Sequence, residues 1–309
     1  MDINEIVSKM LKKHYLLNMG AGKLSRWFEV DRDVIYEAKK LAREKLVPSR
    51  FPRILVFDIE TAPIEAEIFR VWKTNVYFNQ VTSDWYMLTW SAKWLFSSQM
   101  LSDKLTPEEA VREDDSRLVK NLWDLLDKAD IVIAHNGDAF DVPKANTRFL
   151  MNGLNPPASY QQIDTKKIAA KQFGFTYNSL AGLAKLFGFD GKDATDHELW
   201  TRCRRGDAEA LAYMEKYNRQ DVKLLEEVYL KMRPWIRAHP NVGLYLNLDY
   251  PVCATCSSSN LELIPNKPYY TQTGIYPQYR CKDCGALTRG RRTIQDKDKR
   301  AQLLVSQAR

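Results

Sequence analysis

Two carboxylates stand two positions apart at the end of a short apolar run. Ile54-Leu-Val-Phe57 has the β-branched and aromatic composition of a buried strand, and it leads into Asp58 and Glu60. Because side chains alternate along a strand, both acids lie on one face, where they repel each other unless a cation lies between them. The pair predicts a divalent metal site, and the alternative is an ordinary strand end with two solvated acids.

A second apolar run, residues 131–134, also leads into polar residues. It continues into Asn136-Gly-Asp138-Ala-Phe-Asp141, in which the Asn-Gly pair favours a turn before a helix that starts near Pro143. An acid at the start of a helix is stabilised by the helix dipole whatever its function, so Asp141 alone could be a cap. The residues themselves do not separate Asp138 from Asp141 as the functional acid.

A third pattern, Tyr217-Asn-Arg-Gln-Asp221, lies on an expected helix that continues through Val228. The spacing i, i+4 puts Tyr217 and Asp221 on one face of this helix, a turn apart. Taken by itself, the pair is equally typical of a half-buried tyrosine next to a solvated aspartate.

Together the three patterns resemble, in type and order, the exonuclease motifs of the DEDD superfamily. Phe57-Asp-Ile-Glu-Thr61, Asn136-Gly-Asp-Ala-Phe-Asp141 and Tyr217-Asn-Arg-Gln-Asp221 are most similar to the proofreading domains of family B DNA polymerases and to related stand-alone exonucleases. The resemblance covers about residues 53–232. Tyr217 is similar to the tyrosine of the tyrosine-type branch (DEDDy); the other branch has histidine there.

The resemblance implies a ribonuclease H-like fold, 3′→5′ exonuclease activity and two catalytic Mg²⁺ or Mn²⁺ ions. It carries four acids over as ligands of these ions: Asp58, Glu60, Asp141 and Asp221. Asp58 is expected to bridge both ions, Glu60 and Asp221 to serve the water-activating ion, and Asp141 the leaving-group ion. Tyr217 is expected to orient the attacking water, because a phenol is a poor base at neutral pH. Oxygen ligands alone suit these hard cations.

Two neighbouring residues receive weaker roles. Asn136 is expected to hold backbone or a substrate sugar. Asp164 precedes a helix and is interpreted as its cap, although related families often have an acid near the site at this point.

The middle of the chain, residues 53–238, alternates strands and helices and therefore predicts an α/β domain with a mixed sheet. We expect strands at 54–59, 67–74, 85–92 and 131–134, and a helix over 116–129, with further helices to about residue 231. The aromatic-rich runs 67–74 and 85–92 are expected to form antiparallel strands beside the first strand, with their aromatics in the core.

Residues 1–48 predict a small all-α module. Helical periodicity covers 2–14 and 21–46, and the second stretch resembles a helix-turn-helix in which Asp31 or Asp33 caps the longer helix. Its expected inward residues are Val34, Ala38, Leu41, Ala42 and Leu46. Lys39, Lys40 and Arg43 would face outward and contact DNA; the alternative is a helical hairpin that only packs.

Residues 248–292 contain two CxxC pairs and predict a small β zinc ribbon. Four thiolates spaced as in Cys253, Cys256, Cys281 and Cys284 suit one structural Zn²⁺, with disulfides as the alternative. Arg289, Arg291 and Arg292 would grip nucleic acid, together with tyrosines that could instead fill the ribbon. A charged tail, 293–309, follows.

Charge distribution agrees with a polyanionic substrate. The formal net charge is +7, with about +4 on residues 1–50 and +5 on residues 240–309 but −2 between them. No apolar run is long enough to span a bilayer and the first residues lack the pattern of a signal peptide, so a cytoplasmic protein without a membrane partner is expected.

The sequence therefore predicts a metal-dependent 3′→5′ exonuclease acting on nucleic acid, with DNA that has a 3′ end as the favoured substrate. Other replication or repair proteins are candidate partners. The alternatives are a DNA-binding regulator or replication accessory protein that uses an inactive nuclease fold as a platform, and an RNA-processing exonuclease.

Overall fold

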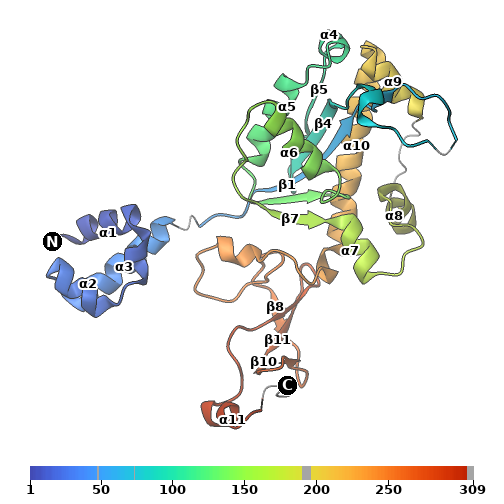
Figure 1. Cartoon of the computed structure of the whole chain (residues 1–309). Helices are drawn as coiled ribbons and strands as arrows, with labels where there is room; N and C mark the ends of the chain where they lie inside the picture. The colour runs from blue at the N-terminus through green and yellow to red at the C-terminus, as the bar shows by residue number, and fades with distance from the viewer. Residues whose placement is uncertain (47–48, 73, 190–195, 305–309) are drawn as a thin grey trace. The chain divides into compact units, whose positions relative to one another are not determined.

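The computed structural model describes residues 1–46, 49–72, 74–189 and 196–304 (Figure 1). The chain divides into two compact units: Pro52–Pro240 forms one, and Met1–Phe51 with Asn241–Arg309 forms the other. Among the residues that the structure describes, no helix combines the length and apolar composition needed to cross a membrane.

A five-stranded mixed sheet forms the centre of the unit Pro52–Pro240. Its strands, in spatial order, are β5 (Leu101–Lys104), β4 (Met87–Trp94), β1 (Ile54–Thr61), β6 (Ile131–Ala134) and β7 (Gln161–Asp164). The central strand β1 runs antiparallel to β4 and parallel to β6, and β6 runs parallel to β7. The predicted α/β class with a mixed sheet is confirmed.

Helices cover both faces of this sheet. They are α4 (Pro107–Val111), α5 (Ser116–Leu126), α6 (Asp141–Met151), α7 (Thr165–Gln172), α8 (Leu180–Phe187), α9 (His197–Arg204) and α10 (Ala208–Met232), followed by a 3₁₀ turn, η3 (Arg233–Trp235). The 25-residue α10 crosses β4 and β1, and α5 packs against β4 and α6.

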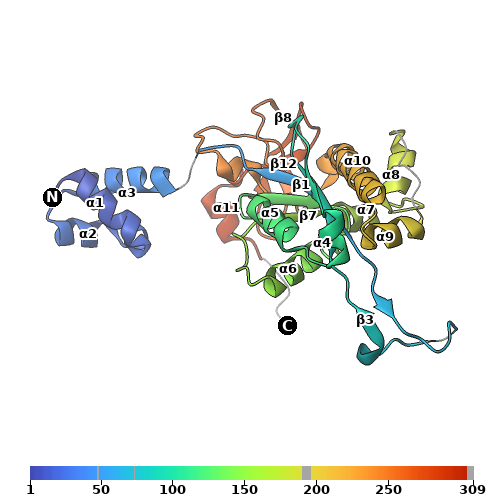
Figure 2. The same ribbon diagram turned by 90° about the horizontal axis from the view of Figure 1, so that it is seen from above.

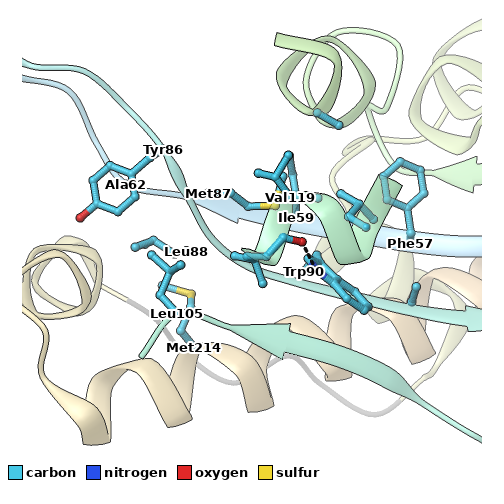
Figure 3. Close-up of a cluster of buried hydrophobic side chains, with 14 of the residues drawn as sticks. Phe57, Ile59, Ala62, Tyr86, Met87, Leu88, Trp90, Leu105, Val119 and Met214 are labelled. Carbon is cyan, nitrogen blue, oxygen red and sulfur yellow. Dashed lines mark hydrogen bonds between the residues drawn. The ribbon is translucent and has the colours of Figure 1, made fainter. Parts of the chain in front are cut away.

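Alternation along β1 places Phe57 and Ile59 on one face of the sheet, and Asp58 and Glu60, after the buried Ile54 and Val56, on the other. Phe57 and Ile59 belong to the buried cluster that includes Val119 of α5. Trp90 lies opposite Ile59 on β4, and its indole N–H donates to the carbonyl of Leu118 at 3.0 Å (Figure 3). The side chains between them point toward α10. The apolar packing therefore fixes which face receives the acids.

The predicted strand at 67–74 is wrong. Residues 67–72 and 74 are not in a strand; they belong to an arm, residues 64–84 apart from 73, that projects from the sheet (Figure 2). The arm contains β2 (Glu65–Ala66), a 3₁₀ turn η2 (Phe78–Gln80) and β3 (Val81–Ser83). Both edges of β1 are already paired, with β4 and β6, so this run has no place beside it.

The expected core role of the arm aromatics is wrong for the same reason. Phe69 is fully exposed and Trp72 is 79% exposed, whereas Trp90 in β4 is buried as predicted. High β-propensity describes residues that suit a half-buried sheet, and here both sides of β1 are already paired.

A buried arginine holds the root of the arm. The Arg204 guanidinium donates to the carbonyl of Pro63 and the hydroxyl of Ser83, which flank the arm's two strands. It also forms ion pairs with Glu65 at 3.1 Å and Glu113 at 2.5 Å. Because Arg204 is only 6% exposed, these partners compensate a cation that is removed from water.

The N-terminal segment is a small helical cluster. It contains α1 (Ile3–Lys12), a 3₁₀ turn η1 (His14–Asn18), α2 (Ala21–Phe28) and α3 (Arg32–Leu46). The inward face of α3 consists of Ile35, Ala38 and Ala42. The expected Val34 and Leu41 pack against this cluster partly buried, Ile35 is an inward residue that was not expected, and Leu46 is exposed.

The C-terminal segment is poor in apolar core. It contains a 3₁₀ turn η4 (Val242–Tyr245), the strands β8 (Leu261–Leu263), β9 (Tyr269–Tyr270), β10 (Ile275–Tyr276), β11 (Gln278–Cys281) and β12 (Leu287–Arg289), and the helix α11 (Lys297–Ala301). A three-stranded sheet, β12-β11-β8, encloses a buried cluster of Cys253, Cys281 and Ala286.

Candidate metal centre

Three carboxylates converge where β1 meets α10. Candidate ligand atoms of Asp58, Glu60 and Asp221 all lie within 4.8 Å of one another. Period 2 places the first two acids on the face of β1 that α10 covers, and Asp221, 3% exposed, comes from α10 itself. Three carboxylates this close repel strongly unless a cation neutralises them, so this acid cluster could hold a divalent metal ion with oxygen ligands.

Asp58 is oriented by a residue that sequence analysis missed. The side-chain amide of Asn218 donates to Asp58 Oδ2 at 2.6 Å, and Asn218 lies one turn before Asp221 on α10. Asn218 Oδ1 and the hydroxyl of Ser91, the residue opposite Asp58 in β4, are buried without a hydrogen-bond partner among the described residues. Such orphaned oxygens beside carboxylates suit bound water or metal.

Glu60 is held by a second missed residue. The indole N–H of Trp200, in α9, donates to Glu60 Oε2 at 3.2 Å. The Trp200 ring also meets the ring of Tyr217 edge-on, with centroids 6.4 Å apart. Tyr217 is 5% exposed, so the predicted catalytic tyrosine is packed next to a residue that contacts the acid cluster. Trp200 belongs to no periodic apolar pattern, because it is an isolated aromatic on a polar helix, and the sequence therefore did not identify it as a site residue.

Asp141 lies beside β1 but outside this close group. Its Oδ1 accepts a hydrogen bond from the backbone N–H of Ile59 at 3.1 Å. The pairing of β6 with β1 extends only to Val56, so Asp141 supplies the acceptor that a neighbouring strand no longer provides. In the described residues, the set of mutually close ligand atoms contains Asp58, Glu60 and Asp221 without Asp141.

Burial raises the pKa of Asp141 to about 7, and the nearby charge of Asp164 adds to the rise. The hydrogen bond from Ile59 and one from the backbone of Asp141 itself act in the opposite direction without cancelling it. A carboxyl group that is 1% exposed is thus costly to ionise unless a cation binds beside it.

Asp164 is the helix cap that the sequence predicted. Its Oδ1 accepts from the backbone N–H groups of Lys166 and Lys167 at 3.0 and 3.1 Å, and from that of Asn136 at 3.0 Å. It therefore ties the turn after β6 to the start of α7. Asp138 lies on this side as well, because its carboxylate pairs with the Lys167 ammonium at 2.5 Å. Asp138 and Asp141, which the sequence did not separate as the functional acid, thus have different partners: Asp138 pairs with Lys167, and Asp141 accepts a hydrogen bond from the Ile59 N–H.

The turn that contains Asn136 has a strict backbone requirement. Asn136 adopts φ of 75°, a left-handed conformation that asparagine tolerates better than most residues. A Cβ on Gly137 would lie 2.5 Å from the Cβ of Ala134. The Asn-Gly pair is therefore explained by the turn, and a substrate contact from Asn136 stays a prediction.

The four paired cysteines also converge. Their sulfur atoms all lie within 4.8 Å of one another, with Cys253 and Cys284 3.7 Å apart and Cys256 and Cys281 3.6 Å apart. Disulfide bonds are about 2.05 Å long, so these are free thiols. Four sulfurs placed tetrahedrally at about 2.3 Å from a Zn²⁺ would lie about 3.8 Å apart. The geometry fits one structural zinc.

The predicted nucleic-acid contacts have varied environments. Lys40, Arg289, Arg291 and Arg292 are exposed. The guanidinium of Arg289 lies 4.6 Å from the ring centre of Tyr276, which holds it at the ribbon surface. These positions remain predictions as substrate contacts.

Lys39 and Arg43 have a structural use that the sequence did not show. The Lys39 ammonium donates to the carbonyl of Met19, and Arg43 donates to the carbonyl of Leu17 at 3.4 Å. Both side chains therefore fasten α3 to the segment around η1. A DNA contact by either would compete with these bonds.

The chain is similar to solved structures and matches a family model. Among solved structures, the family B DNA polymerase from the hyperthermophilic archaeon Pyrobaculum calidifontis is similar with 16% identity and a TM-score of 0.45. The match covers 60% of this chain and 25% of that chain, so this chain spans about a quarter of the polymerase. No curated protein matches the chain by sequence. A family model of the RNase H superfamily matches residues 55–233, more than half of the chain, and the protein belongs to that superfamily.

Proposed function

We propose that the protein is a metal-dependent 3′→5′ exonuclease of the DEDDy type, with DNA as its main substrate. The observation that carries the proposal is the convergence of Asp58, Glu60 and Asp221 on one face of β1 and α10. The superfamily has a nuclease fold, which implies a nucleic-acid substrate. The direction of cleavage and the choice of DNA come from the motif resemblance.

The acids have distinct duties in this proposal. Asp58, Glu60 and Asp221 hold one divalent ion, and Asp141 completes a second site from the neighbouring side of β1. Two Mg²⁺ or Mn²⁺ ions would supply an activated water and neutralise charge on the leaving oxygen. Asn218 and Trp200 keep Asp58 and Glu60 in their orientations, which limits the rearrangement needed when metal binds.

Tyr217 orients the attacking water through its hydroxyl. Its ring is fixed by burial and by the edge-on contact with Trp200, so the hydroxyl has little freedom. A residue that only orients water can be replaced by phenylalanine with a loss of rate but not of metal binding. This separates Tyr217 from the four acids.

The other unit supplies grips for the strand. Arg289, Arg291 and Arg292 on the ribbon and Lys40 on α3 are exposed cations that could bind phosphates without reading sequence. A structural Zn²⁺ held by the four cysteines would keep the ribbon folded. Other replication or repair proteins remain candidate partners.

Oligonucleotides labelled at the 5′ end test the proposal directly. With Mg²⁺ or Mn²⁺, the wild type should give a ladder of shortened 5′-labelled products, and Asp58→Ala should lower the rate on the order of 10³-fold. Asp124→Ala, which removes an exposed acid on α5, should leave the rate unchanged.

Single- and double-stranded DNA and RNA are compared in the same assay. Faster cleavage of RNA would make the protein an RNA-processing exonuclease. Binding of DNA with no metal-dependent cleavage of any nucleic acid would overturn the proposal in favour of a regulatory or accessory protein.

A further inference from the structure

The arm that projects between β1 and β4 carries four aromatic side chains outside the core (Figure 2). Phe69 and Phe78 are almost fully exposed, Trp72 is 79% exposed and Tyr77 is 67% exposed. We call these four side chains the arm rings. A single exposed aromatic is ordinary, but four of them close together in the sequence form a patch of the kind that marks an interaction site.

The backbone of the arm has a defined conformation that keeps rings outside. Gln80 joins its two limbs, because its Nε2 donates to the carbonyl of Glu67 at 3.1 Å and its Oε1 accepts from the backbone N–H of Tyr77 at 3.0 Å. The backbone N–H of Glu67 donates to the carbonyl of Gln80 at 2.9 Å. With Arg204 at the root, these bonds hold the backbone that carries Tyr77 and Phe78. Side chains on a preorganised backbone lose less conformational entropy when a ligand binds.

The charge of the arm favours an anionic partner. From residue 68 to residue 83 the sequence contains no Asp or Glu, and every charged residue in this stretch is a cation. Arg70, next to the first ring, is exposed. The acids of the arm lie near its root, at Glu65, Glu67 and Asp84. Aromatic rings interleaved with cations are typical of surfaces that bind nucleic acid.

The chemistry of the arm rings suits a single strand. In a duplex the bases stack on one another, whereas a single strand offers its base faces to aromatic side chains. Every base has such a face, so stacking of this kind does not depend on sequence. A protein partner that buried the rings in an apolar groove would gain nothing from the cations between them and would have to desolvate them.

The arm begins on the strand that carries two acids of the proposed site. β1 ends at Thr61, one residue after Glu60, and Phe69 follows Glu60 by nine residues. Fully extended, this stretch of chain spans at most about 30 Å. A nucleic-acid strand at a spacing of about 3.4 Å covers that distance with roughly nine nucleotides. One strand can therefore reach both the acid cluster and the arm.

We propose that the arm rings, together with Arg70, bind single-stranded DNA on the 5′ side of the 3′ end by stacking on its bases. The inference rests on the proposed exonuclease function for the identity of the strand, and it adds a second contact to that function. Stacking on the arm would keep the strand bound while its 3′ end is shortened at the acid cluster.

The test measures binding without cleavage. Fluorescence anisotropy follows the affinity of the full-length Asp58→Ala protein for two strands of about 20 nucleotides: an oligothymidylate, and a strand of abasic sites with the same charge. In this background, Phe69→Ser/Phe78→Ser should weaken binding of the thymidylate strand about 100-fold, because each lost stack is worth roughly tenfold. Binding of the abasic strand should stay nearly unchanged, since it has no bases to stack.

Further variants in the same background separate stacking from charge. Phe69→Trp/Phe78→Trp exchanges the rings for other rings and should retain the affinity for the thymidylate strand. Arg70→Met should weaken both strands alike and reduce the slope of log Kobs against log salt by about 0.7. Trp235→Ser is the matched control, because it removes a 66% exposed ring on η3, outside the arm, and should alter neither affinity.

Equal affinity for the thymidylate strand with and without Phe69→Ser/Phe78→Ser would overturn the inference. An equal loss for the thymidylate and abasic strands would overturn it as well, since stacking acts on bases alone. A dimer in light scattering that the double variant disrupts, with unchanged DNA binding, would make the arm rings an interface between two copies of the chain. None of these outcomes involves cleavage, so failure of this inference and failure of the exonuclease proposal can be told apart.

Discussion

The two candidate metal sites of this protein have opposite relations to their surroundings. The acid cluster lies on β1 and α10, next to a core that packs without it. The cysteine cluster is itself most of the core of its segment, since Cys253, Cys281 and Ala286 are the residues of its buried cluster. The fold around the acid cluster has a hydrophobic core of its own, whereas the cysteine cluster supplies most of the core of its segment.

The electrostatic consequences differ in the same way. Asp141 and Asp221 are 1% and 3% exposed, and Asp58 and Glu60 lie near Asp221, so ionised acids oppose folding until a cation arrives. The cysteine sulfurs lie 3.6–3.7 Å apart and leave room for a metal ion between them. Apart from the cysteines and Ala286, the C-terminal segment has little buried apolar surface to stabilise it. Bound metal should therefore reduce the repulsion between carboxylates at the acid cluster and stabilise the folded C-terminal segment at the cysteine cluster.

Removing zinc should have the largest effect, confined to the ribbon. Structural zinc contributes on the order of 10 kcal/mol of apparent binding free energy, more than so small a core can replace. A chelator or Cys256→Ser should expose the amides of β8, β11 and β12 to hydrogen exchange while those of Pro52–Pro240 stay protected. Cys203→Ser, which removes the buried thiol outside the cluster, should leave zinc content unchanged. Full zinc content in Cys256→Ser would refute the ribbon.

Neutralising Asp141 should stabilise the metal-free protein. Because the pKa of Asp141 is raised to about 7, the folded state keeps a proton that the unfolded state releases near pH 4. Its contribution to stability is therefore present at low pH and is lost as pH rises to about 7.

Asp141→Asn retains an oxygen for the Ile59 N–H and should be more stable than wild type by about 4 kcal/mol at pH 7, with a vanishing difference near pH 4. Thermal unfolding in chelator across this range measures it, with Asp124→Asn as the exposed control. Parallel stability profiles for wild type and Asp141→Asn would contradict the expectation.

Removing the amide that orients Asp58 should have the smallest effect of the three. Asn218→Ala should weaken Mn²⁺ binding about tenfold, because partners of metal ligands typically contribute 10- to 100-fold in affinity. Asn121→Ala offers a matched control: its amide donates to Asp103 at 2.8 Å, away from the cluster. Equal Mn²⁺ affinities in all three proteins would show that Asn218 only fills space.

Local pattern was sufficient for β1, β4 and β6, for the helix that begins at Ser116 and for the first pair of acids. Alternation along β1 placed Asp58 and Glu60 on one face, and the position of Asp164 before a helix predicted its cap. The α/β class followed from the order of strands and helices.

Contacts that depend on packing between distant segments were not visible in the sequence. Asn218 and Trp200 reach the acid cluster only because α10 packs across β1 and α9 packs against α10. The strand expected beside β1 at 67–74 failed for a similar reason, since propensity does not reveal which strands pair with β1.

The arm is a removable insertion. It joins β1 to β4, two antiparallel neighbours that a tight turn could connect, and Glu65 lies opposite Ser83 at its root. Replacing residues 66–82 by Asn-Gly would keep the partners of Arg204 and delete every fully exposed aromatic of the arm. Those side chains lie outside the buried core, and their exposure makes self-association at high concentration the expected cost of keeping them.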